Sequence, residues 1–464
     1  MRGLPAGLAA AAAILAITAC GPFTGSDEQT AEAPGAPLRV LEANPRYFAD
    51  AAGKAVYLTG SHVWWSLVGD RSWKIQPCEN PAEEEFSYSQ YLDRLEDYGH
   101  NFVRLWTLEV PRWEECGETV TVAPQPWLRT GPGQSLDGGP KFDLSRPDPS
   151  YFDRLRDRVQ AAAERGIYVS VMLFEGWGLQ NHGEWRWASH PFNVANNVNG
   201  VNGDANGDGT GTEAHTLTTP AVTQIQEDYV RRVVDTVGGF DNVLYEVANE
   251  SGSYSTDWQY HMIRLVKELE ASKGTHHPVG MTFQHAHGNN ETLLQSPADW
   301  ISPAGAEFMT DPPAASGVKV SLSDTDHHCG ICGDADFVWR NFLRGHNPIY
   351  MDPLDDDPSR EAARVAMGQA RSYAERFDLA RSHPQPELSS TQYCLVVPER
   401  EYLVYQPGTG PFTVELGSTT RRYAVEWLET ASGRRIEGAS EEGSGSRTFT
   451  PPVEGPVVLY LRSE

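Results

Sequence analysis

Eight short apolar runs alternate with helical patterns between residues 39 and 381, and this alternation limits the fold more than any other feature. Amphipathic stretches such as 88–99, 151–166 and 225–239 separate the runs, and each of these three ends at a glycine. Eight strands that each lead into a helix predict a (β/α)8 TIM barrel. The runs lie at 55–65, 101–108, 167–174, 242–251, 278–283, 299–302, 318–324 and 347–353.

A doubly wound open sheet is the alternative α/β arrangement. It would place a glycine-rich phosphate-binding turn after the first strand, whereas the first run ends in Trp64 and Trp65. We therefore favour the barrel and assign it to residues 39–385.

The character of the sequence changes after the barrel segment. From Thr391 onward, short runs of alternating apolar residues are separated by Gly, Pro and Ser turns, without a helical period. This pattern predicts a small C-terminal β-sandwich at 386–464.

The N-terminus carries one arginine, then an Ala- and Leu-rich stretch from Leu4 to Ala19, then Cys20. It resembles a bacterial lipoprotein signal, which implies removal of residues 1–19 and lipidation of Cys20. An ordinary secretory signal is the alternative. Residues 20–38 lack periodicity and predict a flexible tether. We expect a protein of the cell envelope that touches a membrane only through its anchor, or a secreted one.

The formal net charge of −26 argues against nucleic acid or an anionic membrane surface as a partner. We expect a monomer.

Export into an oxidising compartment favours paired or buried cysteines. We predict bridges between Cys78 and Cys116 and between Cys329 and Cys332, and a buried, reduced Cys394.

Two stretches could hold a metal. Asp204, Asn206 and Asp208 begin a calcium-loop pattern whose twelfth position is His215 rather than glutamate; a Gly/Asn-rich turn is the alternative. The stretch 327–332 could offer two histidines and two cysteines to zinc, but so short a loop suits a tetrahedral site poorly. We expect no catalytic cofactor, and calcium only in a structural role.

Polar residues close most of the predicted strands, where barrels of this kind build their active sites. A glutamate that follows the apolar run of the fourth strand needs a partner or a function. Helix N-terminal stabilisation is the structural alternative for it. We expect Trp106 in the core and Trp65 and Trp177 nearer the surface. The candidate residues are His62, Trp65, Arg104, Glu175, Trp177, Asn249, Glu250, His285, His287, Asp324, Asp326 and His327.

This constellation resembles the clan of cellulase-like, retaining (β/α)8 glycoside hydrolases. The resemblance implies that Glu250 is the acid/base, that Asn249 holds the sugar 2-hydroxyl and that Arg104 braces the nucleophile. Asp324 takes the nucleophile's position, with Asp326 as the alternative, whereas the clan uses glutamate there. Two carboxyl groups suit glycoside cleavage, because one must be protonated to release the leaving group and the other ionised to attack. The arginine would keep the second one ionised. Carbohydrate is then the expected substrate.

The last seventy or so residues resemble the collagen-binding domain of a collagenase, which is found after barrel glycosidases that include apiosidase-like enzymes. We expect it to buttress the barrel. Two other functions stay open at this point. The chain could be an inactive barrel that binds glycans at the cell surface, or a matrix-binding adhesin that acts through the sandwich.

Overall fold

The computed structural model describes residues 35–69, 86–115, 118–180, 184–285 and 287–464. Cys20, Cys78 and Cys116 lie outside the described residues, so the lipidation and the first disulfide stay predictions. Among the described residues, no helix is long and apolar enough to cross a bilayer.

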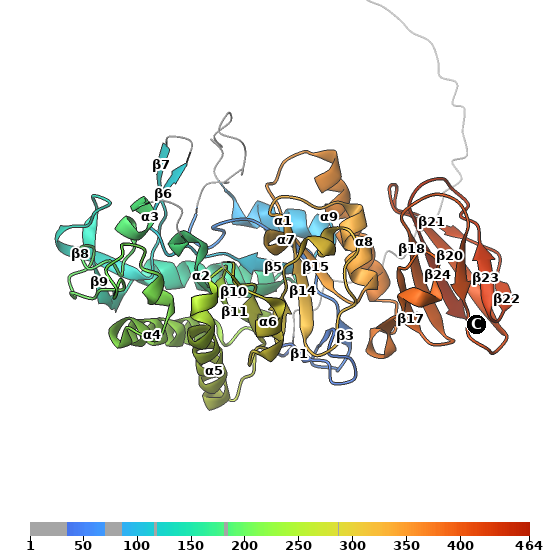
Figure 1. Cartoon of the computed structure of the whole chain (residues 1–464), viewed down its shortest axis with the longest axis horizontal. Helices are drawn as coiled ribbons and strands as arrows, with labels where there is room; N and C mark the ends of the chain where they lie inside the picture. The colour runs from blue at the N-terminus through green and yellow to red at the C-terminus, as the bar shows by residue number, and fades with distance from the viewer. Residues whose placement is uncertain (1–34, 70–85, 116–117, 181–183, 286) are drawn as a thin grey trace, which may run out of the picture. The chain divides into compact units, whose positions relative to one another are not determined.

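Eight parallel strands form a nearly closed barrel sheet, and their spatial order follows their order in the sequence (Figure 1). All eight predicted runs contribute a strand, so the predicted barrel is confirmed. Leu244, Trp300, Leu322 and other buried apolar side chains fill one end of its interior. The strands are β4 (Gly60–His62), β5 (Phe102–Leu105), β10 (Tyr168–Glu175), β11 (Val243–Asn249), β12 (Val279–Thr282), β13 (Trp300–Ser302), β14 (Val320–Asp324) and β15 (Asn347–Met351).

The first and second barrel strands meet where the sheet closes. Asn101 donates its backbone N–H to Thr59 O at 3.0 Å, and its side-chain oxygen accepts the Thr59 N–H at 3.0 Å. A Cβ added to Gly60 would lie 2.0 Å from Phe102 O. Glycine is thus the residue that lets the two backbones approach at this point.

Several of the principal helices begin at a residue whose side chain caps them. Ser87, Asp148 and Asp357 each accept a backbone N–H from the first turn of the following helix. Long helices with one buried face surround the sheet (Figure 1). They are α1 (Tyr88–Asp97), α2 (Pro149–Ala163), α4 (Pro220–Val237), α5 (Thr256–Lys273), α8 (Ala335–Leu343) and α9 (Pro358–Ala374), with the short helices α3 (Glu184–Ser189), α6 (Asn290–Gln295) and α7 (Thr325–His328).

Smaller antiparallel elements decorate the barrel. The predicted first run is divided: β3 (Ala55–Val56) joins β1 (Arg39–Val40) and β2 (Phe48–Ala49) in a separate sheet, and the barrel strand begins only at Gly60. Two hairpins follow the second barrel strand, formed by β6 (Arg112–Glu115) with β7 (Glu118–Thr121) and by β8 (Trp127–Gln134) with β9 (Pro140–Pro147).

The C-terminal segment, predicted as a β-sandwich, forms antiparallel sheets. Its strands β17, β18 and β24 share an apolar cluster with α8 and α9, while their other face packs on a second cluster. The strands are β16 (His383–Pro384), β17 (Cys394–Val397), β18 (Glu401–Gln406), β20 (Arg421–Glu429), β21 (Arg434–Glu437), β22 (Glu441–Gly443) and β24 (Val457–Ser463), with β19 (Phe412–Glu415) and β23 (Ser446–Phe449) in a second sheet.

Candidate active site

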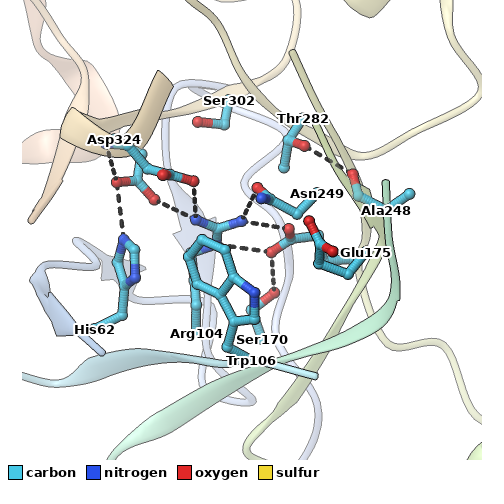
Figure 2. Close-up of polar contacts among 12 residues, drawn as sticks. His62, Arg104, Trp106, Ser170, Glu175, Ala248, Asn249, Thr282, Ser302 and Asp324 are labelled. Carbon is cyan, nitrogen blue, oxygen red and sulfur yellow. Dashed lines mark hydrogen bonds and ion pairs between the residues drawn. The ribbon is translucent and has the colours of Figure 1, made fainter. Parts of the chain in front are cut away.

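Arg104 on β5 is the centre of a buried charge cluster inside the barrel (Figure 2). Its guanidinium donates to both Glu246 carboxyl oxygens at 2.9 and 2.6 Å. It also donates to Asp324 Oδ2 at 3.0 Å and to Asp326 Oδ2 at 3.1 Å. Its side chain is 2% exposed and lies over the Trp106 ring at 4.8 Å. One cation therefore holds three carboxylates from β11, β14 and the start of α7.

Asp324, the last residue of β14, accepts hydrogen bonds through both carboxyl oxygens. His62 Nε2 donates to Oδ1 at 2.9 Å, and the Asp326 backbone N–H donates to the same oxygen at 3.0 Å. Burial alone would raise the pKa of Asp324, but His62 and Arg104 hold it well below its usual value. Asp324 is thus kept ionised, and its side chain is only 1% exposed.

Asp326 lies two residues further on, in the first turn of α7, and is less enclosed, with 6% of its side chain exposed. Burial raises the pKa of Asp326 to about 6, although the Arg104 guanidinium opposes this shift. The neighbouring His327 is buried, and burial together with Arg104 lowers its pKa well below the usual range. His327 is therefore neutral: its Nε2 donates to Asn249 Oδ1 at 3.2 Å and its Nδ1 accepts from Ser302 Oγ at 2.8 Å.

Glu250 directly follows β11, and 15% of its side chain is exposed. Its Oε1 lies 3.6 Å from Nδ1 of the half-exposed His285. Burial raises the pKa of Glu250 well above its usual value, and the carboxylates of Asp326 and Glu175 add to the shift. The protonated form of Glu250 is therefore favoured by its surroundings, whereas the ionised form of Asp324 is favoured by His62 and Arg104.

Asn249 is fully buried and lies between Arg104 and His327. Its Oδ1 accepts from Arg104 Nη2 at 2.7 Å and from His327 Nε2 at 3.2 Å. Its Nδ2 has no hydrogen-bond partner among the described residues. A buried amide group with free donors can receive a ligand's oxygen.

Glu175 ends β10 and is 2% exposed. It accepts the backbone N–H groups of Trp177 at 2.7 Å and Gly178 at 3.0 Å, which fixes the short helix η1 (Trp177–Leu179). Burial nevertheless raises the pKa of Glu175 to about 8. In the structure, this candidate residue positions Trp177.

Tryptophans gather beside this helix. Trp177 stacks on Trp113 with ring centroids 5.4 Å apart, and the partly exposed Trp64 lies 5.9 Å from Trp177. The expectation that Trp65 lies nearer the surface is wrong. Its side chain is 5% exposed, because its ring packs edge-on against Trp113. The expectation that Trp106 is buried is confirmed at 3% exposure.

Two glutamates were not among the candidates predicted from the sequence. Glu246 is fully buried and paired with Arg104. Glu109 accepts a hydrogen bond at Oε2 from His215 Nε2 at 2.8 Å. The alternation of side chains along β11 could have identified Glu246, because residues 244 and 246 point to the same side of the strand and Leu244 points inward. The candidate His287 is exposed in a left-handed conformation, with φ of 60°.

A disulfide joins Cys329 and Cys332 just after α7, as predicted. The bridge engages both sulfur atoms, which disfavours zinc at this loop. The prediction for Cys394 is confirmed as well, since this cysteine is free and buried in β17.

The carboxylates of Asp204, Asp208 and Glu213 come close enough for ligand atoms from each to lie within 4.8 Å of one another. His215, the twelfth position of the predicted loop, points instead to Glu109 and Ser251. Asn206 donates to Asp208 at 3.0 Å. Calcium binding here stays a prediction.

Part of the chain matches a known family, and the fold matches solved structures. A family model described as a domain of unknown function (DUF6298) matches residues 102–295, from β5 to α6. No curated protein matches the chain.

Solved structures share its fold. One described as a glycoside hydrolase is 11% identical with a TM-score of 0.60, covering 92% of this chain and 97% of its own. A glycoside hydrolase family 5 protein from Bacteroides vulgatus is 11% identical with a TM-score of 0.59, covering 92% and 93%. Another protein from that organism, provisionally named a glycoside hydrolase, is 14% identical with a TM-score of 0.63, covering 95% and 84%. At these identities the likeness shows a common fold.

Proposed function

We propose that this protein is a glycoside hydrolase that uses two carboxyl groups. The observation that carries the proposal is a pair of carboxyl groups at neighbouring strand ends in opposite electrostatic environments. Burial and neighbouring carboxylates raise the pKa of Glu250 after β11, while His62 and Arg104 lower the pKa of Asp324 at the end of β14. Cleavage of a glycosidic bond requires this pair of an acid and an anion. The resemblance in fold to glycoside hydrolases supports the same proposal.

In this mechanism Glu250 gives its proton to the glycosidic oxygen as the bond to the anomeric carbon breaks, and the bonding electrons stay on that oxygen. An aspartate oxygen attacks the anomeric carbon. Glu250, now ionised, then takes a proton from the water that displaces the aspartate. Net retention of configuration follows from the two displacements.

We assign the attacking carboxylate to Asp326, with Asp324 as the alternative. Asp324 already accepts three hydrogen bonds and is 1% exposed. Asp326 is 6% exposed, and its charge raises the pKa of Glu250 more than that of Asp324 does. Asp324 would then hold Arg104 and His62 in place.

The substrate is a neutral glycan, such as a polysaccharide side chain. The free Nδ2 of Asn249 suits a sugar hydroxyl, and the exposed part of Trp177 suits the C–H face of a pyranose ring. A uronic acid would bring a second negative charge close to the attacking carboxylate of Asp326, which disfavours it.

A glycan panel with the wild type and Glu250→Gln tests the proposal. On substrates with poor leaving groups, the variant should lose on the order of 10²- to 10⁴-fold in kcat, because general acid catalysis is gone. With an activated aryl leaving group the first step should be spared, and azide should accelerate the second. Glu227→Gln, on α4 beside His261, is the control and should match the wild type.

Wild-type turnover by Glu250→Gln on poor leaving groups would contradict the assignment. Asp326→Asn and Asp324→Asn separate the two aspartates, since azide restores turnover only where the lost carboxylate attacked the sugar. NMR of the first-formed anomer tests retention.

The alternative functions have less support. A complete carboxyl pair disfavours an inactive glycan-binding barrel. The segment 386–464 is described throughout, and none of its large apolar side chains is exposed, which disfavours an adhesive patch there. Export and lipid anchoring remain part of the proposal, since they rest on the sequence around Cys20.

A further inference from the structure

The backbone of Glu250 adopts a conformation that needs support. Its φ is +46°, in the left-handed region that residues other than glycine seldom occupy. Such a conformation is strained and persists only where the surroundings enforce it. One supporting contact is direct, because Gln180 Nε2 donates to Glu250 O at 2.6 Å.

The next residue is held by a buried chain of polar side chains. Ser251 Oγ donates to His215 Nδ1 at 2.9 Å, and His215 Nε2 donates to Glu109 Oε2 at 2.8 Å. Ser251 and His215 are both fully buried. The His215 ring stacks on Trp258, with centroids 4.4 Å apart and planes 10° from parallel. The imidazole therefore has one orientation, fixed by its two partners and by the indole.

Serine, histidine and a carboxylate in this order are the parts of an acyl-hydrolase triad, but these residues cannot serve as one. Ser251 has no exposed surface, and a Cβ added to Gly176 would lie 2.3 Å from its Oγ. A substrate carbonyl has no room to approach that oxygen, whereas triad chemistry needs an accessible nucleophile. The chain of contacts ends instead at the residue bonded to Glu250.

We infer that Glu109, His215 and Ser251 form a positioning relay that fixes the backbone of Glu250 and so aims its carboxyl at the glycosidic oxygen. The relay joins three segments: the residues after β5, the end of η2 (Thr212–His215) and the end of β11. The inference rests on the proposed function. None of the three residues needs to touch the substrate; each acts through the position of Glu250.

The relay predicts a particular kinetic change. A displaced Glu250 transfers its proton poorly, so His215→Gln should lower kcat on the order of 10- to 100-fold for a poor leaving group. An activated leaving group requires no proton, so its first step should change little. The measurement is the ratio of the two single-turnover rates for glycosylation, which is independent of the fraction of active enzyme. A variant that was only less stable would leave this ratio unchanged.

Two further variants complete the experiment. Ser251→Ala removes only a hydroxyl and should shift the ratio in the same direction. His277→Gln is the matched control: His277 is also a buried histidine paired with a glutamate, Glu270, at 2.7 Å, but it precedes β12 at the opposite end of the barrel. Its ratio should equal that of the wild type.

The outcomes separate the inference from the proposed function. An active wild type with an unchanged ratio in His215→Gln and Ser251→Ala overturns the relay and leaves the hydrolase proposal in place. A wild type that cleaves no glycoside overturns both.

Discussion

Among single residues, the carboxyl groups with shifted pKa values define a pH window for activity. Asp326 must be ionised to attack, so activity should fall as the pH drops through its pKa of about 6. Glu250 must be protonated to act as an acid, so activity should fall again as the pH rises through its raised pKa. The plot of kcat/KM against pH should therefore be bell-shaped, with its maximum above about 6. A maximum in clearly acidic solution would contradict these assignments.

The residue scale also shows how far the sequence alone could reach. Asn249 and Glu250 follow from their position at the end of the fourth strand and Arg104 from its place in the second, and the structure brings Asn249 and Arg104 into contact. The contact between Glu109 and His215 links residues 106 positions apart through two loops without a regular period. No pattern in the sequence reports such a pair. The burial that separates Asp324 from Asp326 is likewise a property of packing, because both follow the same apolar run.

At the scale of elements, the meeting of β4 with β5 completes the barrel. A Cβ at Gly60 would lie 2.0 Å from Phe102 O, so Gly60→Ala must push the two backbones apart. We expect it to lower the free energy of unfolding by about 1–3 kcal/mol, measured by urea denaturation. Gly239→Ala is the control, because a Cβ there meets no atom within 4 Å. Equal stability of the two variants would show that closure at Gly60 is not tight.

The sequence predicted which strands exist better than it predicted the residues at which they begin and end. Runs rich in apolar residues, each alternating with a helical pattern, located all eight barrel strands. The pattern did not show that the first run divides, with Ala55 and Val56 in a separate sheet and Gly60–His62 in the barrel, since only the pairing partners distinguish the two parts. Tertiary pairing decided that boundary.

For the whole molecule, the apolar cluster shared by α8, α9 and the C-terminal sheet predicts coupled unfolding. Trp339 on α8 is fully buried, and its ring lies 6.0 Å from Tyr373 on α9 and 6.2 Å from Tyr405 on β18. Tyr373 also donates to Glu426 on β20 at 2.6 Å. We expect one calorimetric transition for the wild type.

Trp339→Ala should weaken this cluster by about 3–5 kcal/mol and separate the transition into two. Trp300→Ala, which removes an equally buried ring from the barrel interior, should lower the melting temperature and leave a single transition. Two separate transitions in the wild type would contradict the coupling.

The spread of the Arg104 cluster along the chain has a consequence for how the molecule is made. His62 and Asp324 are 262 residues apart, and Arg104 and Asp324 are 220 apart. These contacts close only after nearly the whole barrel has been synthesised and its distant strands have paired, which is slow compared with the formation of local helices. During refolding, circular dichroism at 222 nm would recover first and catalysis last. Enzymatic activity is therefore a reporter of completed folding in this chain, and helix content is not.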